Sequence, residues 1–248
     1  MEIGFRIIRP EDIGAQPLTF AQISLWRIAA WDVADGEQAV AGALEIAKAC
    51  KERGIRTVFH PLEYPLTGER AETTLSVLRR LAAVSDLGII IHDEGGTGGK
   101  RLSDAEAALF EQRLRELSRL CPVSIENAFN SGDCLWFWER FVAPAGGRVS
   151  ITLDIGHLES AGVDSVSFVR NLPGHLARRV DYVHMHHKGA ERYGISDHWP
   201  LVPGCRELEA LKALLSRKRD PRVVLELEAK EEGVRESIEL LRDLRGKA

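Results

Sequence analysis

Short apolar runs rich in β-branched residues alternate along this chain with longer amphipathic stretches of helical period. The apolar runs predict β-strands at residues 3–8, 20–25, 55–60, 88–92, 122–126, 149–154, 180–186 and 222–227. The amphipathic stretches predict helices at residues 36–53, 69–85, 103–120, 133–143, 163–177, 205–218 and 230–245. Strands that alternate with helices are typical of βα units joined in a parallel sheet.

Eight such units indicate an α/β protein with a (β/α)8 barrel, also called a TIM barrel. The chain has 248 residues, which is close to the usual length of one barrel. The first two predicted strands are separated by only about a dozen residues, so the first helix should be short or missing. No linker, repeat or low-complexity tract interrupts the pattern, and we expect residues 1–248 to form a single domain.

Six of the predicted strands end on side chains of the types that bind metal ions. Parallel barrel strands bring their carboxyl ends to one mouth, where catalytic groups of this fold lie. Zinc and manganese ions bind imidazole and carboxylate groups. The sequence therefore predicts a metal centre built from the strand ends that carry His60, His92, Glu126, Asp154, His157, His184, His186 and Glu226.

Charge and composition narrow the expected partners. The net charge is −4, and the longest basic stretch is residues 217–219, so a nucleic-acid substrate is not expected. No apolar run is long enough to cross a membrane, and the N-terminus lacks the pattern of a signal peptide. Four scattered cysteines are typical of a reduced, cytoplasmic protein. We expect a small-molecule substrate, and a homo-oligomer stays an open alternative.

Five motifs follow one another in the second half of the chain: SIENAFNSG, TLDIGHLESAGVD, DYVHMHH, DHWPLVPG and VVLELE. In this series the chain resembles the superfamily that joins endonuclease IV (AP endonuclease family 2) with xylose isomerase-like sugar isomerases and epimerases. The resemblance extends from about residue 55 onward. Its epimerase branch implies one metal ion held by Glu126, Asp154, His184 and Glu226, with His157 touching the substrate. Its endonuclease branch implies two or three zinc ions that also use His60, His92, His157 and His198.

Two departures from the family pattern lie after the seventh predicted strand. Asp197 and His198 are adjacent, where the family has Asp-x-His, and this change speaks against a third metal ion. Lys188 stands where the family often has an acid, so it is a candidate contact for an anionic group of the substrate. With His157, the residues His186, Lys188 and Trp199 form the predicted substrate-binding set. Trp26 and Trp199 are placed to stack on a sugar ring.

These features favour a metal-dependent isomerase or epimerase of a small sugar, sugar phosphate or related hydroxy-carbonyl compound. Glu126 and Glu226 are the predicted catalytic pair, which would move a proton beside the carbonyl through an enediolate. An endonuclease IV-like zinc phosphodiesterase is one alternative, and a metal- or sugar-binding barrel without turnover is another. The expected cofactor is zinc or manganese, with magnesium or cobalt as alternatives. One ion is expected, and three are the upper limit, with Asp197 and His198 among the additional ligands.

Overall fold

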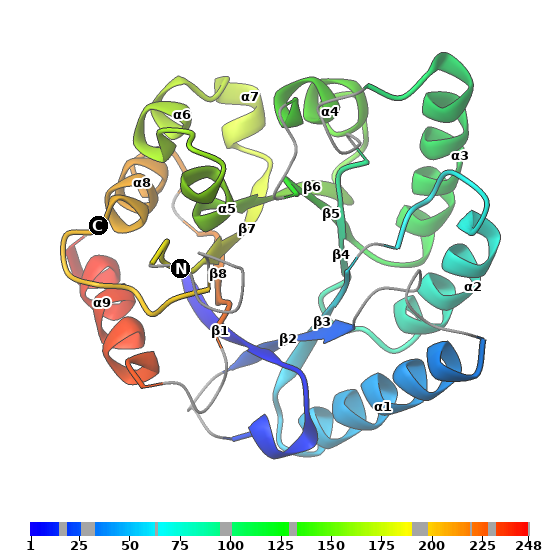
Figure 1. Cartoon of the computed structure of the whole chain (residues 1–248), viewed down its shortest axis with the longest axis horizontal. Helices are drawn as coiled ribbons and strands as arrows, with labels where there is room; N and C mark the ends of the chain where they lie inside the picture. The colour runs from blue at the N-terminus through cyan, green and yellow to red at the C-terminus, as the bar shows by residue number, and fades with distance from the viewer. Residues whose placement is uncertain are drawn as a thin grey trace.

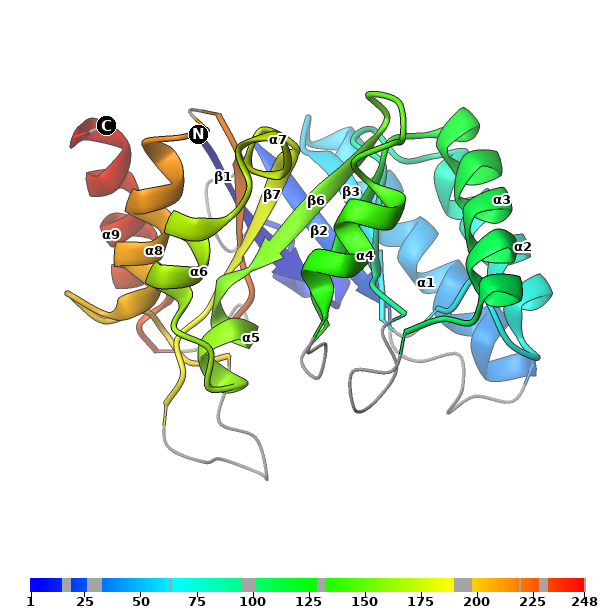
Figure 2. The same ribbon diagram turned by 90° about the horizontal axis from the view of Figure 1, so that it is seen from above.

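Eight parallel strands close into a barrel in the computed structural model, as the sequence predicts (Figures 1 and 2). The structure describes residues 1–14, 19–25, 33–62, 64–94, 101–128, 133–189, 198–218, 220–227 and 232–247. Each strand pairs with its neighbour in the chain, and β1 pairs with β8 to complete the ring. The strands are β1 (Glu2–Ile7), β2 (Phe20–Leu25), β3 (Arg56–Pro61), β4 (Ile89–His92), β5 (Val123–Glu126), β6 (Val149–Asp154), β7 (Val180–Met185) and β8 (Arg222–Leu225).

Helices surround the barrel and cover the outer face of the strands (Figure 1). Buried leucine, isoleucine, valine and phenylalanine side chains fill the space between the two layers. None of the described helices is both long and apolar enough to span a membrane. The α-helices are α1 (Val33–Glu52), α2 (Ala71–Ala82), α3 (Asp104–Leu120), α4 (Cys134–Phe141), α5 (Ile155–Ser160), α6 (Ser165–Asn171), α7 (Gly174–Ala177), α8 (Arg206–Leu215) and α9 (Val234–Lys247).

The predicted shortening of the first helix is confirmed. Between β1 and β2, the described residues form one 3-10 turn, Pro10–Asp12, in place of a full helix. The helix expected at 163–177 is instead two helices, α6 and α7, separated at Pro173. Proline has no backbone N–H and forces the preceding residue out of the helical region, and Leu172 accordingly has φ −55° and ψ 127°.

Helix α5 was not predicted, and it begins directly at the end of β6. The side chain of Asp154 accepts a hydrogen bond of 2.6 Å from the backbone N–H of His157 and so caps this short helix. Figure 2 shows α5 at the end of the barrel opposite the two chain termini. The candidate ligands lie at this same end, where the strands have their carboxyl ends.

The barrel interior has an apolar layer below a polar one. Alternate residues of a strand point to the same face, so residues two positions apart share the interior. One buried cluster consists of Phe20, Val58, Ile90, Tyr182 and Val224. Two residues further along the same strands come Gln22, His60, His92, His184 and Glu226. The apolar layer therefore closes the barrel beneath the metal-type side chains and leaves them open only toward the carboxyl ends of the strands.

Candidate metal centre

Three carboxylates surround one nitrogen of His184 at the mouth of the barrel. Nδ1 of His184 lies 3.0 Å from Oε1 of Glu126, 3.6 Å from Oε1 of Glu226 and 3.7 Å from Oδ2 of Asp154. The four side chains come from the ends of β5, β6, β7 and β8, and all are buried. The structure thus brings together the four residues that the epimerase branch of the resemblance implies as ligands.

The arrangement suits a divalent cation. Ligand atoms about 2.0–2.2 Å from a four-coordinate ion lie about 3.3–3.6 Å from one another, close to the spacing seen around His184. Among the described residues, no hydrogen bond of good geometry is formed by either carboxylate oxygen of Glu126, by Oδ2 of Asp154 or by either ring nitrogen of His184, although Nδ1 of His184 lies 3.0 Å from Oε1 of Glu126. Buried polar atoms normally find a partner, so this donor set fits a metal ion of the zinc or manganese type.

Burial and mutual charge move the pKa values of these groups in opposite directions. Burial raises the pKa of Glu126 to about 8, although the neighbouring His184 opposes the rise. Burial would also raise the pKa of Glu226, but His184, a hydrogen bond with His198 and the charge of Arg6 outweigh it together and hold that pKa well below its usual value. The pKa of His184 lies well above its usual value because Glu126 and Glu226 outweigh the lowering by burial. Near neutral pH, the metal-free centre therefore holds protons on Glu126 and His184 while Glu226 stays ionised.

Hydrogen bonds to the backbone fix the orientation of Asp154. The side-chain amide of Asn127 donates to the carbonyl of Asp154 at 2.9 Å, and its oxygen accepts from the Asp154 N–H at 2.8 Å. Oδ1 of Asp154 is held by the His157 N–H, which leaves Oδ2 facing His184. The Glu126-Asn127 pair of the sequence motif therefore supplies one candidate ligand and positions another.

His60 presents a second metal-type group beside Glu126. Its Nδ1–H donates to the backbone carbonyl of Ile90 at 3.3 Å, and burial holds its pKa well below the usual value. The remaining nitrogen, Nε2, therefore carries a lone pair, and it lies 3.1 Å from Oε2 of Glu126. Nε2 of His92 is 3.8 Å from the same oxygen. Two acceptor atoms this close need a proton or a cation between them.

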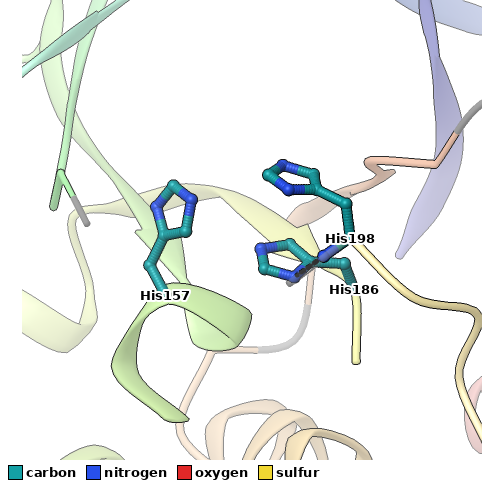
Figure 3. A group of neighbouring side chains, drawn as sticks. All are labelled: His157, His186 and His198. Carbon is teal, nitrogen blue, oxygen red and sulfur yellow. Dashed lines mark hydrogen bonds between the residues drawn. The ribbon is translucent and has the colours of Figure 1, made fainter. Parts of the chain in front are cut away.

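A third group consists of His157, His186 and His198 (Figure 3). The rings of His186 and His198 stack at 4.3 Å, and the backbone N–H of His198 donates to Nδ1 of His186 at 3.0 Å. Because Nδ1 accepts this bond, the ring proton of His186 lies on Nε2, which faces Oδ1 of Asp154 at 3.3 Å. While Nδ1 accepts from the His198 N–H, the ring of His186 offers no lone pair to a metal ion.

The remaining predicted residues lie around the rim. The ammonium group of Lys188 donates to the carbonyl of Glu159 in α5 at 3.1 Å. Trp199 pairs with His187 in an isolated antiparallel bridge. His198 has a left-handed backbone with φ 58°, and its Nε2 lies 3.5 Å from Oε2 of Glu226. Asp197 and Trp26 lie outside the described residues.

The first two strands contribute polar residues that the sequence reasoning missed. Gln22 donates to Oε1 of Glu226 and, at 3.4 Å, to the hydroxyl of Ser24. Arg6 lies beside Gln22 in the strand register and is also buried. The available signal was a polar residue at alternate positions of two otherwise apolar strands. It was overlooked because arginine, glutamine and serine are not typical metal ligands.

A sequence profile of the family described as xylose isomerase-like TIM barrel matches residues 16–244. No match is found among curated proteins. Similar folds occur in solved structures. The IOLI protein with a bound zinc atom has a TM-score of 0.67 and 13% identity, and the match covers 100% of this chain and 99% of that one.

Two further structures are similar over most of their length. A xylose isomerase-like TIM barrel protein from Mycobacterium smegmatis in complex with magnesium has a TM-score of 0.60 and 14% identity, over 96% of this chain and 87% of that chain. D-allulose 3-epimerase from Methylomonas sp. in complex with D-allulose has a TM-score of 0.56 and 14% identity, over 100% of this chain and 94% of that chain. At these identities the likeness concerns the fold.

Metal binding should strengthen as the pH rises toward 8. A metal ion needs deprotonated ligands, and the raised pKa values of Glu126 and His184 mean that both lose a proton when the ion binds. We expect the apparent affinity to fall about tenfold per pH unit for each proton displaced. Calorimetry of zinc or manganese binding in buffers of different ionisation enthalpy measures the release, and Glu126→Gln should release one proton fewer. An affinity that stays constant between pH 6 and 8 would contradict the assignment.

Gly156→Ala should disturb the centre through His186. A Cβ atom at position 156 would lie 2.3–2.5 Å from atoms of the buried His186 ring, so the ring must move. We expect a loss of about 1–3 kcal/mol in the free energy of unfolding, measured with denaturant, together with weaker metal binding. Gly42→Ala is the control, because a Cβ there meets nothing within 4 Å. Equal stability of the two variants would show that the ring is not held as described.

Proposed function

We propose that this chain, which belongs to the xylose isomerase-like TIM barrel family, is a metal-dependent isomerase or epimerase of a small hydroxy-carbonyl compound. The observation that carries the proposal is the crowding of three buried carboxylates around Nδ1 of His184. The proposed ligands are Glu126, Asp154, His184 and Glu226. Solved relatives by fold include a D-allulose 3-epimerase and an L-ribulose 3-epimerase, which supports this reaction class.

A divalent ion held by these residues would act as a Lewis acid that polarises the substrate carbonyl and stabilises an enediolate. The protein supplies the proton transfers. Glu126 and Glu226 each direct Oε1 toward His184, while each Oε2 faces another histidine: His60 at 3.1 Å and His198 at 3.5 Å. We assign Glu226 and Glu126 as the pair that removes a proton beside the carbonyl and returns one.

The shape of the centre favours a small substrate. The interior is closed from below by the apolar layer, so a reactant must enter from the carboxyl ends of the strands. His157 lies between Asp154 and Glu126, with Nδ1 at 3.2 Å and 3.7 Å from their oxygens, and is the proposed contact for a substrate hydroxyl. The net charge of −4 gives no support to a polyanionic partner such as DNA.

A zinc phosphodiesterase is the second candidate, and the geometry of His60 favours it. Its lone pair faces Oε2 of Glu126, and His92 lies nearby, so these three residues offer a place for a second ion. Two ions could then share Glu126, as a phosphodiester reaction with a bridging hydroxide requires. Nδ1 of His186 accepts a hydrogen bond from the His198 N–H, so the ring proton lies on Nε2 and no lone pair is available, which argues against a third ion in the His157, His186 and His198 group.

The first test is proton exchange with solvent. Manganese- or zinc-loaded protein is incubated in D2O with a panel of aldoses, ketoses and their phosphates, including D-allulose, and deuterium beside the carbonyl is measured by NMR. We expect exchange with at least one compound and a loss of about 10²–10⁴-fold in Glu226→Gln. Glu209→Gln on the exposed face of α8 is the control. The metal content of each variant is measured as well. A variant that has lost the ion would lose exchange activity because the metal is absent, whatever the role of the substituted residue in proton transfer.

The second test counts metal ions in His60→Gln. In the isomerase, His60 lines the site without binding an essential ion, so the variant should keep one metal per chain and part of its exchange activity. In a two-zinc phosphodiesterase, the same change should remove one metal. Plasma emission spectroscopy gives the metal content, and nicking of abasic-site DNA gives the second activity. Nicking by wild type well above the Glu126→Gln background would overturn the isomerase assignment.

A further inference from the structure

Arg6 projects its side chain into the barrel interior from β1. The β1–β2 register pairs Arg6 with Gln22, and paired residues of parallel strands point to the same face. Gln22 is inside, because its amide donates to Glu226. On the other side, Phe5 pairs with Leu225, so the next residues, Arg6 and Glu226, are neighbours on adjacent strands. Arg6 therefore enters the polar layer beside the proposed catalytic pair.

Within the part of the chain that the structure describes, no hydrogen bond or close ion pair holds the guanidinium of Arg6, although its charge acts on Glu226 and lowers the pKa of that carboxyl. The residue is 9% exposed, and its Nε atom is buried without a hydrogen bond. Arg113 is equally buried but donates to the carbonyl of Leu66 and pairs with Glu72. The contrast shows that this fold does satisfy an arginine placed elsewhere in its interior.

Arginine keeps its charge at every ordinary pH, and the neighbouring Glu226 is its counter-charge in the metal-free centre. A divalent ion bound by Glu226 would compete with Arg6 for that carboxylate and leave the buried Nε–H of Arg6 still without an acceptor. The side-chain oxygen of Gln22 is likewise buried and makes no hydrogen bond within the described residues. Arg6 offers an unused donor and Gln22 an unused acceptor on neighbouring strands beside the metal centre, and together they indicate a place for part of a ligand. The charge of Arg6 favours an anionic group there, because hydrogen bonds from guanidinium to charged acceptors are the stronger ones, while a hydroxyl of the same ligand can donate to Gln22.

We propose that Arg6 binds an anionic group, a carboxylate or a phosphate, of the compound on which the metal centre acts. The inference rests on the proposed function and narrows its substrate class to sugar acids or sugar phosphates. The planar guanidinium can donate two parallel hydrogen bonds to such a group. Gln22 on β2 donates to Glu226 at the end of β8, and Arg6 lies on β1 between these two strands, so the anion would lie beside the proton-transfer group.

The position of Arg6 also limits the size of the substrate. Lys188, the cation expected from the sequence to meet an anion, is exposed at the rim and donates to Glu159. Arg6 instead lies within the barrel, at the level of the residue next to Leu225. The anionic group and the metal-binding oxygens must therefore be a few bonds apart in one compact molecule.

Three matched three-carbon compounds test the proposal: D-glyceraldehyde, D-glycerate and D-glyceraldehyde 3-phosphate. Their dissociation constants are measured by calorimetry with manganese-loaded wild type, Arg6→Gln, Arg6→Lys and Arg56→Gln. Arg56 is the control because it lies at the start of β3, at the opposite end of the barrel, where it pairs with Glu2. The neutral aldehyde reports on metal binding alone, and the two anions distinguish a carboxylate from a phosphate.

We expect one of the two anions to bind wild type about 10- to 100-fold more tightly than the neutral aldehyde. Arg6→Gln should lose this preference, Arg6→Lys should keep part of it, and Arg56→Gln should keep all of it. The melting temperature of the metal-free Arg6→Gln variant should fall below that of wild type, because Glu226 loses its neighbouring positive charge. A purely structural arginine would lower it too, so the anion preference, which such a role would not change, distinguishes the two.

The proposal is overturned if neither anion binds wild type more tightly than the aldehyde, or if Arg6→Gln keeps the preference. If Arg6→Gln fails to fold, Arg6→Lys becomes the deciding variant. An unchanged anion preference in Arg6→Lys would exclude a role for the two parallel hydrogen bonds of the guanidinium. Failure of the proposed function is recognised separately. In that case the anion preference is present while no sugar in the deuterium panel exchanges its proton.

Discussion

Negative charge buried around His184 is the constraint on which the rest of the centre depends. Glu126, Asp154 and Glu226 approach one imidazole nitrogen in a region that water hardly reaches, and their mutual repulsion must be balanced by a proton or a metal ion. Neighbouring polar residues hold these carboxylates in place. Asn127 fixes the backbone of Asp154, and Gln22 holds Glu226. The closed barrel is what permits side chains from eight separate strands to converge this closely.

The fold was predictable because its signal is local and repeated. Each strand is a short apolar run, each helix has its own period, and the eight-fold alternation leaves few arrangements open. The convergence of Glu126, Asp154, His184 and Glu226 could be predicted for the same reason, since residues at strand ends must meet at one mouth. The break at Pro173 was a recognisable local signal too, although the amphipathic pattern on both sides concealed it.

The parts that could not be predicted depend on contacts between distant strands. Arg6 and Gln22 look like ordinary strand residues until the barrel closes and brings β1 beside β8. The proton position on His60 and His186 depends on the Ile90 carbonyl and the His198 N–H, which no spacing in the sequence reveals. Helix α5 begins where the side chain of Asp154 caps it, and the apolar pattern of the strand before it gives no sign of this cap. Asp197 and Trp26 lie outside the described residues and stay predictions.

The left-handed backbone of His198 has a consequence for the position of the ring proton on His186. This conformation directs the His198 N–H at Nδ1 of His186, and that one bond decides which ring nitrogen bears the proton. A substitution that relaxed this turn would release Nδ1 and let the proton change sides, converting a hydrogen-bond donor into a metal ligand. The backbone conformation at His198 would then decide how many metal ions the centre can bind.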